Sequence, residues 1–405
     1  MTSARRRILF IGEAFSLAHI SRLIVLAKTL DASRYEIHFA APASAASRYV
    51  LDGGPFQTWT VTGTTEDRFV ARLRRGLPLW TVTELEEAVR SDRDVLRKIR
   101  PDLVVSDLRV SMSTSAPLEG VRHATIVNAQ WSTYAVPVRQ PPPETMLSPY
   151  IPGFTQRYFD LVRPLAFWLY TRPINRLRRR HGLKSFGSST GRALYGADDV
   201  LYVDPPGIVR MRTQLPANHR FLGAPMWSPD VALPPWWDDL SPDRPLIYVS
   251  LGSTGKLGAL PTILRALRDA PYRVAAAVGG RAATLDVPAN AHVAPYLPGD
   301  ALARRATIVI GNGGSPGLYQ ALAEGRPVLG VPHNIDQHMC MAAVEQFGAT
   351  LSLRSDWLSA RAIRRSVERL VEEPAFSEAA AAAATLIRDH PVAESFPRYV
   401  EETLG

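Results

Sequence analysis

Short runs of consecutive apolar residues alternate with longer segments of helical periodicity through both halves of this sequence. The runs cover 8–11, 37–40, 103–106, 125–127 and 200–203 in the first half, and 246–251, 273–278, 291–293, 307–310 and 328–331 in the second. Strands that are apolar on both faces are typical of parallel sheets covered by helices on both sides. The alternation therefore predicts an α/β chain with one doubly wound lobe in each half.

The chain has 405 residues, more than one hydrophobic core usually holds. Between the two series of apolar runs, residues 221–245 are rich in Pro, Trp and Asp, a composition that favours a linker. We therefore predict an N-terminal lobe over 1–220, a linker over 221–245 and a C-terminal lobe over 246–390. A last helix over 391–405 is expected to pack back on the N-terminal lobe.

Charge and cysteine content restrict the classes of partner. The formal net charge is +9, and the basic residues form short clusters without a recognition motif for DNA or RNA. We expect no nucleic-acid partner, whereas phosphorylated ligands or an anionic membrane surface suit the charge. The single cysteine, Cys340, excludes an internal disulfide and a multi-cysteine metal site. These features predict a cytoplasmic protein, with peripheral contact at the inner face of the membrane left open.

A glycine-rich segment, 311–317, follows the run at 307–310 and precedes an expected helix over 318–324. Glycines let a backbone approach a ligand closely, and a helix N-terminus offers unpaired N–H groups to an anion. The segment alone is equally compatible with a turn that binds nothing. Further on, Asp336 and Gln337 could hold vicinal hydroxyls by paired hydrogen bonds, although an isolated pair of this kind is more often a helix cap.

Taken together, residues 292–349 (HVAPYLPGDALARRATIVIGNGGSPGLYQALAEGRPVLGVPHNIDQHMCMAAVEQFGA) resemble the donor-binding segment of family 1 glycosyltransferases. Weaker matches are LIYVSLGST at 246–254, NRLRRRHGL at 175–183 and residues 221–225. The resemblance implies a GT-B fold, in which two Rossmann-like doubly wound lobes face each other across a cleft. It also implies transfer of a sugar from a nucleotide diphosphate, with no cofactor other than this co-substrate.

The resemblance assigns a role to each matching position of the donor site. It implies that the base stacks on Tyr296 and hydrogen-bonds backbone groups at Leu297, and that Asp336 and Gln337 hold the donor sugar. The positions expected to face the diphosphate are Gly252, Ser253, Thr254, Asn312, Gly313, Gly314, Ser315 and Gly317.

Three positions depart from the family pattern. Asn312 stands where most members have a His against the phosphate, and Asn can donate a hydrogen bond but carries no charge. Gly299 replaces a Gln, and Gln320 replaces a Glu that holds the ribose hydroxyls. A weaker grip on the ribose favours a dTDP-sugar, because its deoxyribose lacks the 2′-hydroxyl, and UDP stays open.

The resemblance places the general base at His19, and an orienting carboxylate at Asp107. His19 follows the first apolar run at the start of a helix, where the helix dipole keeps the imidazole neutral and able to accept a proton. Asp107 follows the run at 103–106 and could fix the tautomer of His19. Without the resemblance, His19 would more often be an exposed bystander and Asp107 a cap or loop carboxylate.

No metal site is expected. The only Asp-x-Asp, at Asp92 and Asp94, lies in a helical stretch over 84–99 and is interpreted as a solvated helix face. The acceptor side is less specific, with Phe15, Trp80, Met112 and Trp131 as candidates that could equally belong to the core. Residues 150–181 combine aromatic and basic side chains, but their three prolines favour short helices in a cleft wall over one long amphipathic helix.

The sequence therefore predicts an inverting, metal-independent glycosyltransferase acting on a hydroxyl of a small-molecule or lipid-like acceptor. Two alternatives remain at this point. A nucleotide-sugar epimerase of the same fold would interconvert the donor without an acceptor. A catalytically silent sugar-nucleotide-binding or activator protein would bind the donor without releasing nucleotide diphosphate, and the missing phosphate His at position 312 keeps that hypothesis open.

Overall fold

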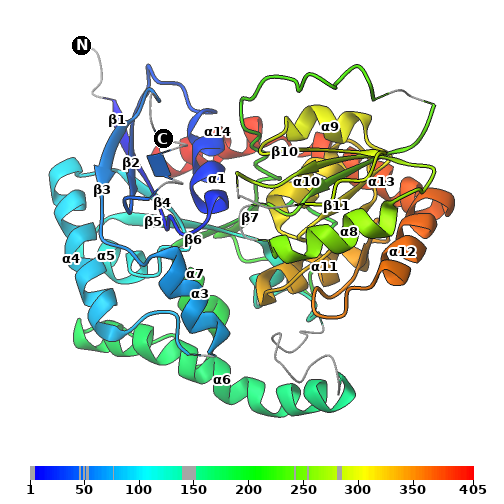
Figure 1. Cartoon of the computed structure of the whole chain (residues 1–405). Helices are drawn as coiled ribbons and strands as arrows, with labels where there is room; N and C mark the ends of the chain where they lie inside the picture. The colour runs from blue at the N-terminus through cyan, green and yellow to red at the C-terminus, as the bar shows by residue number, and fades with distance from the viewer. Residues whose placement is uncertain are drawn as a thin grey trace.

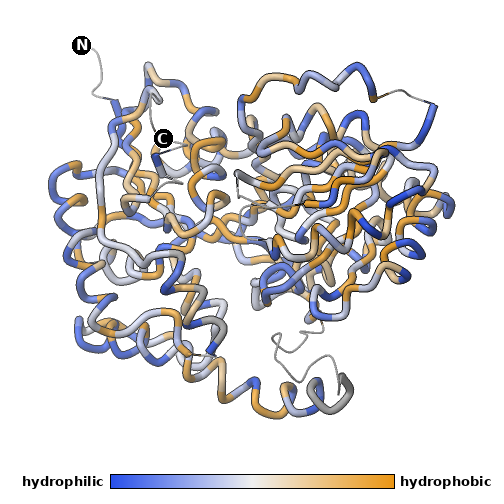
Figure 2. The backbone as a smooth tube through the Cα atoms, in the orientation of Figure 1, coloured by the Kyte–Doolittle hydropathy of each residue, from blue (hydrophilic) through white to orange (hydrophobic). Residues whose placement is uncertain are grey.

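The computed structural model describes residues 5–44, 47, 48, 51, 54–75, 77–138, 152–240, 243–252, 255–280 and 285–405. These residues form two lobes, each built on a parallel sheet with helices on both faces (Figure 1). The strands are the most hydrophobic segments of both lobes, and the outer helices alternate between hydrophobic and hydrophilic residues (Figure 2). This arrangement confirms the fold class predicted from the sequence.

The N-terminal sheet has seven strands in the order β3-β2-β1-β4-β5-β6-β7. Its strands are β1 (Arg6–Gly12), β2 (Tyr35–Ala41), β3 (Gln57–Thr60), β4 (Leu103–Asp107), β5 (Arg122–Val127), β6 (Asp199–Tyr202) and β7 (His219–Phe221). The helices of this lobe are α1 (Leu17–Ala27), α3 (Glu66–Arg74), α4 (Val82–Ile99), α5 (Met112–Glu119), η1 (Ala129–Trp131), α6 (Pro152–Arg180) and α7 (Thr190–Tyr195).

The C-terminal sheet has six strands in the order β10-β9-β8-β11-β12-β13. They are β8 (Leu246–Ser250), β9 (Arg273–Ala277), β10 (Ala291–Ala294), β11 (Ile308–Gly311), β12 (Val328–Gly330) and β13 (Thr350–Ser352). The helices are η2 (Leu257–Ala259), α8 (Leu260–Leu267), α9 (Gly299–Arg305), α10 (Ser315–Ala323), α11 (Ile335–Glu345), α12 (Ala360–Glu372) and α13 (Pro374–Asp389).

The order of strands reverses at one place in each sheet. In the N-terminal lobe the reversal lies between β1 and β4, where Gly12 pairs with Asp107, and in the C-terminal lobe between β8 and β11, where Ser250 pairs with Gly311. Ligands of open α/β sheets bind beyond the carboxyl ends of strands at such reversals. The fold therefore offers one ligand-binding position in each lobe.

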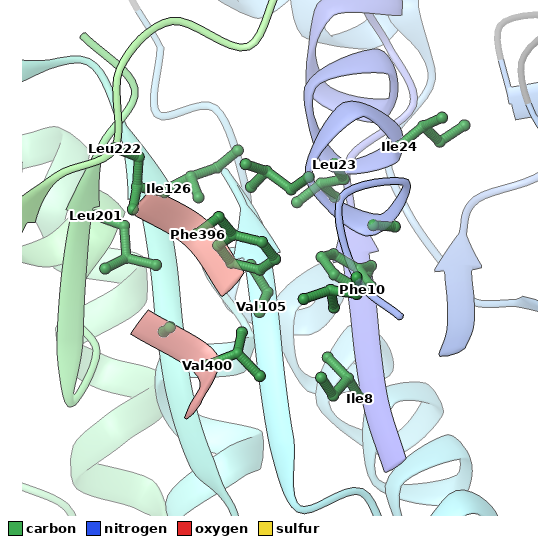
Figure 3. Close-up of a cluster of buried hydrophobic side chains, with 14 of the residues drawn as sticks. Ile8, Phe10, Leu23, Ile24, Val105, Ile126, Leu201, Leu222, Phe396 and Val400 are labelled. Carbon is green, nitrogen blue, oxygen red and sulfur yellow. The ribbon is translucent and has the colours of Figure 1, made fainter. Parts of the chain in front are cut away.

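The last helix, α14 (Val392–Leu404), leaves the C-terminal lobe and packs on the first sheet. Its Phe396 and Val400 are fully buried and point toward Phe10 and Val105 of the central strands (Figure 3). The linker also packs on protein, because Trp236 stacks on His292 with ring centroids 4.7 Å apart. Chain crossings at 221–245 and before α14 thus tie the two lobes together.

The structure corrects the expectation for residues 150–181. In place of several short helices, one helix, α6, runs from Pro152 to Arg180 with Pro164 and Pro173 inside it. Each proline removes one backbone hydrogen bond, and the eight residues between them still form more than two helical turns. Packing against α4 and α7 stabilises the C-terminal half of the helix.

The structure also corrects the interpretation of Asp92, which is fully buried. Its Oδ1 accepts hydrogen bonds from Nε and Nη2 of Arg109 at 3.1 and 2.7 Å, and its Oδ2 accepts from the hydroxyls of Ser111 and Ser115 at 2.6 and 3.0 Å. Arg109 in turn donates to Glu13 at 2.7 Å. Asp92 lies seven residues after the buried Leu85, so helical spacing already placed it on the core face of α4.

Replacement of Asp92 by Asn should destabilise the N-terminal lobe by about 3 kcal/mol, because the buried Arg109 loses one of its two carboxylate partners. Urea unfolding followed by circular dichroism measures the loss. The matched control is Asp94→Asn on the same helix, where the side chain is exposed, with an expected change within about 0.5 kcal/mol. Equal effects of the two substitutions would contradict the buried ion pair.

The buried His123 of β5 should make the folding stability of the protein depend on pH. Burial lowers the pKa of His123 from 6.5 to about 3, and its Nε2 lies 2.7 Å from the Ser106 hydroxyl. Between these two pH values the unfolded chain binds a proton that the folded chain does not. Stability should therefore fall as the pH decreases through this window, by about 1.4 kcal/mol per pH unit.

The unfolding free energy of wild type, His123→Gln and His390→Gln, measured at several pH values, tests this dependence. The His123 variant should show a shallower slope below pH 6.5 than wild type. The variant of the exposed His390 should keep the wild-type slope. The same slope in all three proteins would show that His123 is not the group that titrates.

Candidate active site

His19 and Asp107 meet at the strand reversal of the N-terminal lobe. His19 lies in the first turn of α1, and its Nδ1 is 2.9 Å from Oδ1 of Asp107 at the end of β4. The Asp107 side chain is 1% exposed and that of His19 is 16% exposed. Because Nδ1 faces the carboxylate, Nε2 is the ring nitrogen that can accept a proton from a substrate.

Arg22, one turn further along α1, completes this cluster. Its Nε donates to Oδ2 of Asp107 and its Nη2 to Oδ1, both at 2.9 Å, and Nη2 lies 3.4 Å from Nδ1 of His19. Burial acts to lower the pKa of Arg22, but attraction to Asp107 outweighs it and the pKa is raised. The guanidinium therefore stays charged and holds the carboxylate in place. Sequence reasoning missed Arg22, whose only signal was its spacing of three residues from His19.

Asn128 carries the hydrogen-bond network from Arg22 to the other lobe. Its Oδ1 accepts from Nη1 of Arg22 at 2.7 Å and from the hydroxyl of Ser315 at 3.0 Å. Asn128 follows β5, whereas Ser315 begins α10 in the C-terminal lobe. A continuous chain of hydrogen bonds thus joins His19 to the glycine-rich segment.

A buried carboxylate, Asp204, fixes the same contact from behind. Its Oδ1 accepts from Nδ2 of Asn128 at 3.1 Å and from the hydroxyl of Tyr319 at 2.6 Å, and its Oδ2 accepts from the backbone N–H of Ala129. Burial raises the pKa of Asp204, and these three donors partly oppose the shift. Because Tyr319 belongs to α10, Asp204 also bridges the two lobes. Neither Asn128 nor Asp204 lies in a motif that the sequence analysis used.

The glycine-rich segment adopts the strand–turn–helix geometry expected of an anion site. Gly313 has a φ of 77°, and a Cβ there would lie 2.5 Å from Cγ of Met341, so only glycine suits the position. The backbone N–H of Gly314 donates to Oδ1 of Asn312 at 2.9 Å, which leaves the Asn312 amide nitrogen facing Gly252. Gly317 is exposed.

The side chain of one predicted phosphate contact in this loop already has a protein partner. The hydroxyl of Ser315 is bonded to Asn128, so in this conformation Ser315 is expected to offer a phosphate its backbone and not its side chain. Ser253 and Thr254, the two other predicted phosphate contacts, lie outside the described residues.

The predicted nucleoside contacts, Tyr296 and Leu297, follow the end of β10. Tyr296 is 47% exposed, with its hydroxyl against the backbone of Gly280, whereas the Leu297 side chain is buried in the core. Only the backbone of Leu297 is therefore left for a base, as the resemblance implied. A Cβ on Gly299 would lie 2.8 Å from Oε1 of Gln320. The two departures from the family pattern are thus neighbours, and the missing side chain at 299 makes room for Gln320.

Asp336 and Gln337 lie in the first turn of α11, and their side chains have different partners. Oδ1 of Asp336 accepts from Nε1 of Trp131, in the N-terminal lobe, at 2.6 Å. Oε1 of Gln337 accepts from the backbone N–H of His333, and Gln337 is 2% exposed. The structure thus presents Asp336 to the region between the lobes and holds Gln337 within its own helix cap.

The candidate acceptor residues separate into three environments. The Phe15 ring stands edge-on to the His19 imidazole at 5.3 Å and stacks on Phe69 at 4.0 Å, and Trp80 lies in the same cluster. Trp131 contacts Asp336, as above. Met112, by contrast, is fully buried with Leu9, Ile11 and other core residues, so it belongs to the core and does not line an acceptor site. A cavity of about 150 Å³ lies beside Trp80 and is also lined by Glu13, Gly63, Arg68 and Val110.

Within the described parts of the chain, no three His, Cys, Asp or Glu side chains gather in a way that could hold a metal ion. The described helices likewise include none long and apolar enough to cross a bilayer.

The chain is similar in sequence to a known protein family and to curated glycosyltransferases. Residues 267–404 match the family described as Erythromycin biosynthesis protein CIII-like, C-terminal domain. A PGL/p-HBAD biosynthesis glycosyltransferase of Mycobacterium tuberculosis is 42% identical over 404 residues, which cover 99% of this chain and 92% of the relative. The chain belongs to the family 1 glycosyltransferases of GT-B fold.

Two further comparisons agree with this assignment. A PGL/p-HBAD biosynthesis rhamnosyltransferase of Mycobacterium bovis is 41% identical over 407 residues, which cover 100% of this glycosyltransferase and 89% of the relative. The structure of the spinosyn rhamnosyltransferase SpnG complexed with thymidine diphosphate matches with a TM-score of 0.70 and 17% identity, and the match covers 98% of this chain and 100% of that one. The latter likeness supports the fold alone.

Loss of the Trp131–Asp336 hydrogen bond should slow sugar transfer. In this glycosyltransferase, Trp131→Phe should lower kcat/KM for the donor about 10-fold, because a hydrogen bond to a charged group contributes about 1.5–3 kcal/mol and Asp336 loses its orientation. Initial rates at varied donor concentration measure the change. Trp357→Phe, at an exposed site of the same lobe as Asp336, is the control. Wild-type kinetics in both variants would contradict a role for the bond.

Proposed function

We propose that this glycosyltransferase moves a sugar from a nucleotide diphosphate to a hydroxyl of a lipid-like acceptor, with inversion at the anomeric carbon and without a metal ion. We infer a dTDP-sugar as the donor. Support comes from the relative named a rhamnosyltransferase, from thymidine diphosphate in the related SpnG structure, and from Gln320 in place of the ribose-binding Glu. The names of the relatives also support a glycolipid acceptor.

In the proposed reaction, Nε2 of His19 takes the proton of the acceptor hydroxyl as its oxygen attacks the anomeric carbon. The bond from that carbon to the diphosphate oxygen breaks at the same time, and attack from the opposite face inverts the configuration. Asp107 keeps Nδ1 protonated and stabilises the imidazolium that forms.

The departing nucleotide diphosphate is stabilised by backbone N–H groups at the start of α10 and by the positive end of that helix. Asn312 would add a neutral donor through its amide nitrogen. This arrangement supplies electrostatic stabilisation that in other transferases comes from a cation. We therefore expect transfer to continue in the presence of EDTA.

One observation carries the proposal. Hydrogen bonds connect His19, Asp107, Arg22, Asn128 and Ser315 in series, so the residue proposed as base and the loop proposed to bind the diphosphate are held in one network across two lobes. A donor that bridges the lobes would place its anomeric carbon between these ends. The aromatic side chains of Phe15, Phe69 and Trp80 beside His19 suit an apolar acceptor.

His19→Ala should reduce sugar transfer by about 10²–10⁴-fold, because it removes the base while leaving the donor loop intact. Release of dTDP from a dTDP-sugar in the presence of a glycolipid acceptor measures the rate. His181→Ala is the control, since His181 lies in the same lobe but pairs with Glu86 at the end of α6.

Donor binding must be measured on the same variants by calorimetry, so that loss of chemistry is distinguished from loss of affinity. The proposal predicts unchanged donor affinity in His19→Ala. Transfer at the wild-type rate by this variant would show that another group is the base. Loss of wild-type activity in EDTA, restored by a divalent cation, would overturn the metal-independent reaction.

A further inference from the structure

One face of α6 carries a row of large apolar side chains in contact with solvent. Tyr158, Leu161, Leu165, Trp168 and Leu169 are 58, 78, 59, 43 and 38% exposed. Their spacing of three or four residues places them on one side of the helix. Figure 1 shows the N-terminal half of α6, which carries most of these residues, extending beyond α3. We call these five residues the apolar stripe.

The same face becomes basic toward the C-terminal end of α6. Arg172, Arg176 and Arg179 continue the three-to-four spacing from Leu169, and all three are exposed. They line a groove of about 260 Å³ together with Leu169, Pro173, Pro78 and Val82. The Arg172 guanidinium also lies over the Trp168 ring, 4.7 Å from its centroid, so the stripe and the basic groove are contiguous.

The charge of this face is not neutralised by neighbours. Among the described residues, no carboxylate lies within salt-bridge distance of these three arginines. The only acidic residue of α6 is Asp160, which the helical period places on the opposite side, about 140° from the centre of the stripe. Glu86 pairs instead with Arg180 and His181. The face therefore presents apolar surface beside uncompensated positive charge.

We propose that this face of α6 rests on a membrane that contains anionic phospholipids, with the apolar stripe entering the interfacial layer and lipid phosphates occupying the arginine groove. A bilayer surface offers apolar and anionic layers side by side, which matches both parts of the face. A second copy of the chain matches less well, because a symmetric pairing of two α6 helices brings arginines against arginines or against an apolar row without any acid.

The inference deepens the proposed function, because a membrane is where a lipid-like acceptor would be met. Its test needs neither donor nor acceptor, so its failure is distinguishable from failure of the proposed transfer. Co-sedimentation of the full chain is measured with phosphatidylcholine vesicles and with vesicles that also contain phosphatidylglycerol.

Wild type should bind the anionic vesicles and not the neutral ones. The triple variant Arg172→Gln, Arg176→Gln, Arg179→Gln should lose about 100-fold in affinity for anionic vesicles, as expected for three basic residues at a charged surface. The matched control, Arg361→Gln, Arg365→Gln, Arg398→Gln, removes the same charge from exposed positions elsewhere and should bind within about twofold of wild type, because surface charge far from the bilayer is screened.

The double variant Leu161→Glu, Leu165→Glu tests the apolar stripe and should lose at least about 10-fold in affinity. Unchanged melting temperatures show that the variants fold. Equal losses in the two triple variants would overturn the proposal, since binding would then follow net charge alone. Absence of wild-type binding, or a dimer that the leucine substitutions dissociate without any vesicle binding, would overturn it as well.

Discussion

The buried ion pair between Asp107 and Arg22 is the interaction on which the rest of the site depends. It neutralises a carboxylate that is 1% exposed, and both of its members contact His19. Removal of one partner from such a pair costs about 3–5 kcal/mol, so the pair is stable only as a unit. Because β4, α1 and the segment after β5 all contribute, the geometry of the base is set by the centre of the N-terminal sheet.

The same network explains how two separate sheets make one site. Each sheet reverses its strand order once, and residues after β5 and β6 of the first sheet bind helix α10 of the second, Asn128 through Ser315 and Asp204 through Tyr319. A third contact, Asp336 to Trp131, lies where the donor sugar is expected. These are polar contacts of single residues. Ala343 of α11 also packs with Val127 and Ala129 of the N-terminal lobe, and helix α14 and the linker make further connections. Such a junction can hold the lobes in register while still permitting the closure that excludes water.

Much of this arrangement could be predicted from the sequence. Continuous apolar runs identified the central strands, and the family resemblance assigned roles to His19, Asp107 and the 311–317 segment, which follow three of those runs. The short edge strands β3, β7 and β13 gave no comparable signal, because 57–60 and 219–221 are polar and 350–352 is brief. Arg22, Asn128 and Asp204 were missed since their roles depend on contacts 76 to 187 residues apart along the chain. Asp92 was misread because an acidic residue was assumed to face water, although its position in the helical period indicated the core.

The most direct test of the account is a crystal structure of the enzyme with thymidine diphosphate and an acceptor bound. The account predicts the diphosphate on the backbone N–H groups at the start of α10. It also predicts the acceptor hydroxyl about 3 Å from Nε2 of His19, with the bond from Nδ1 to Asp107 intact. A diphosphate bound away from residues 311–317, or a His19 ring turned from the acceptor while another group approaches its hydroxyl, would contradict it.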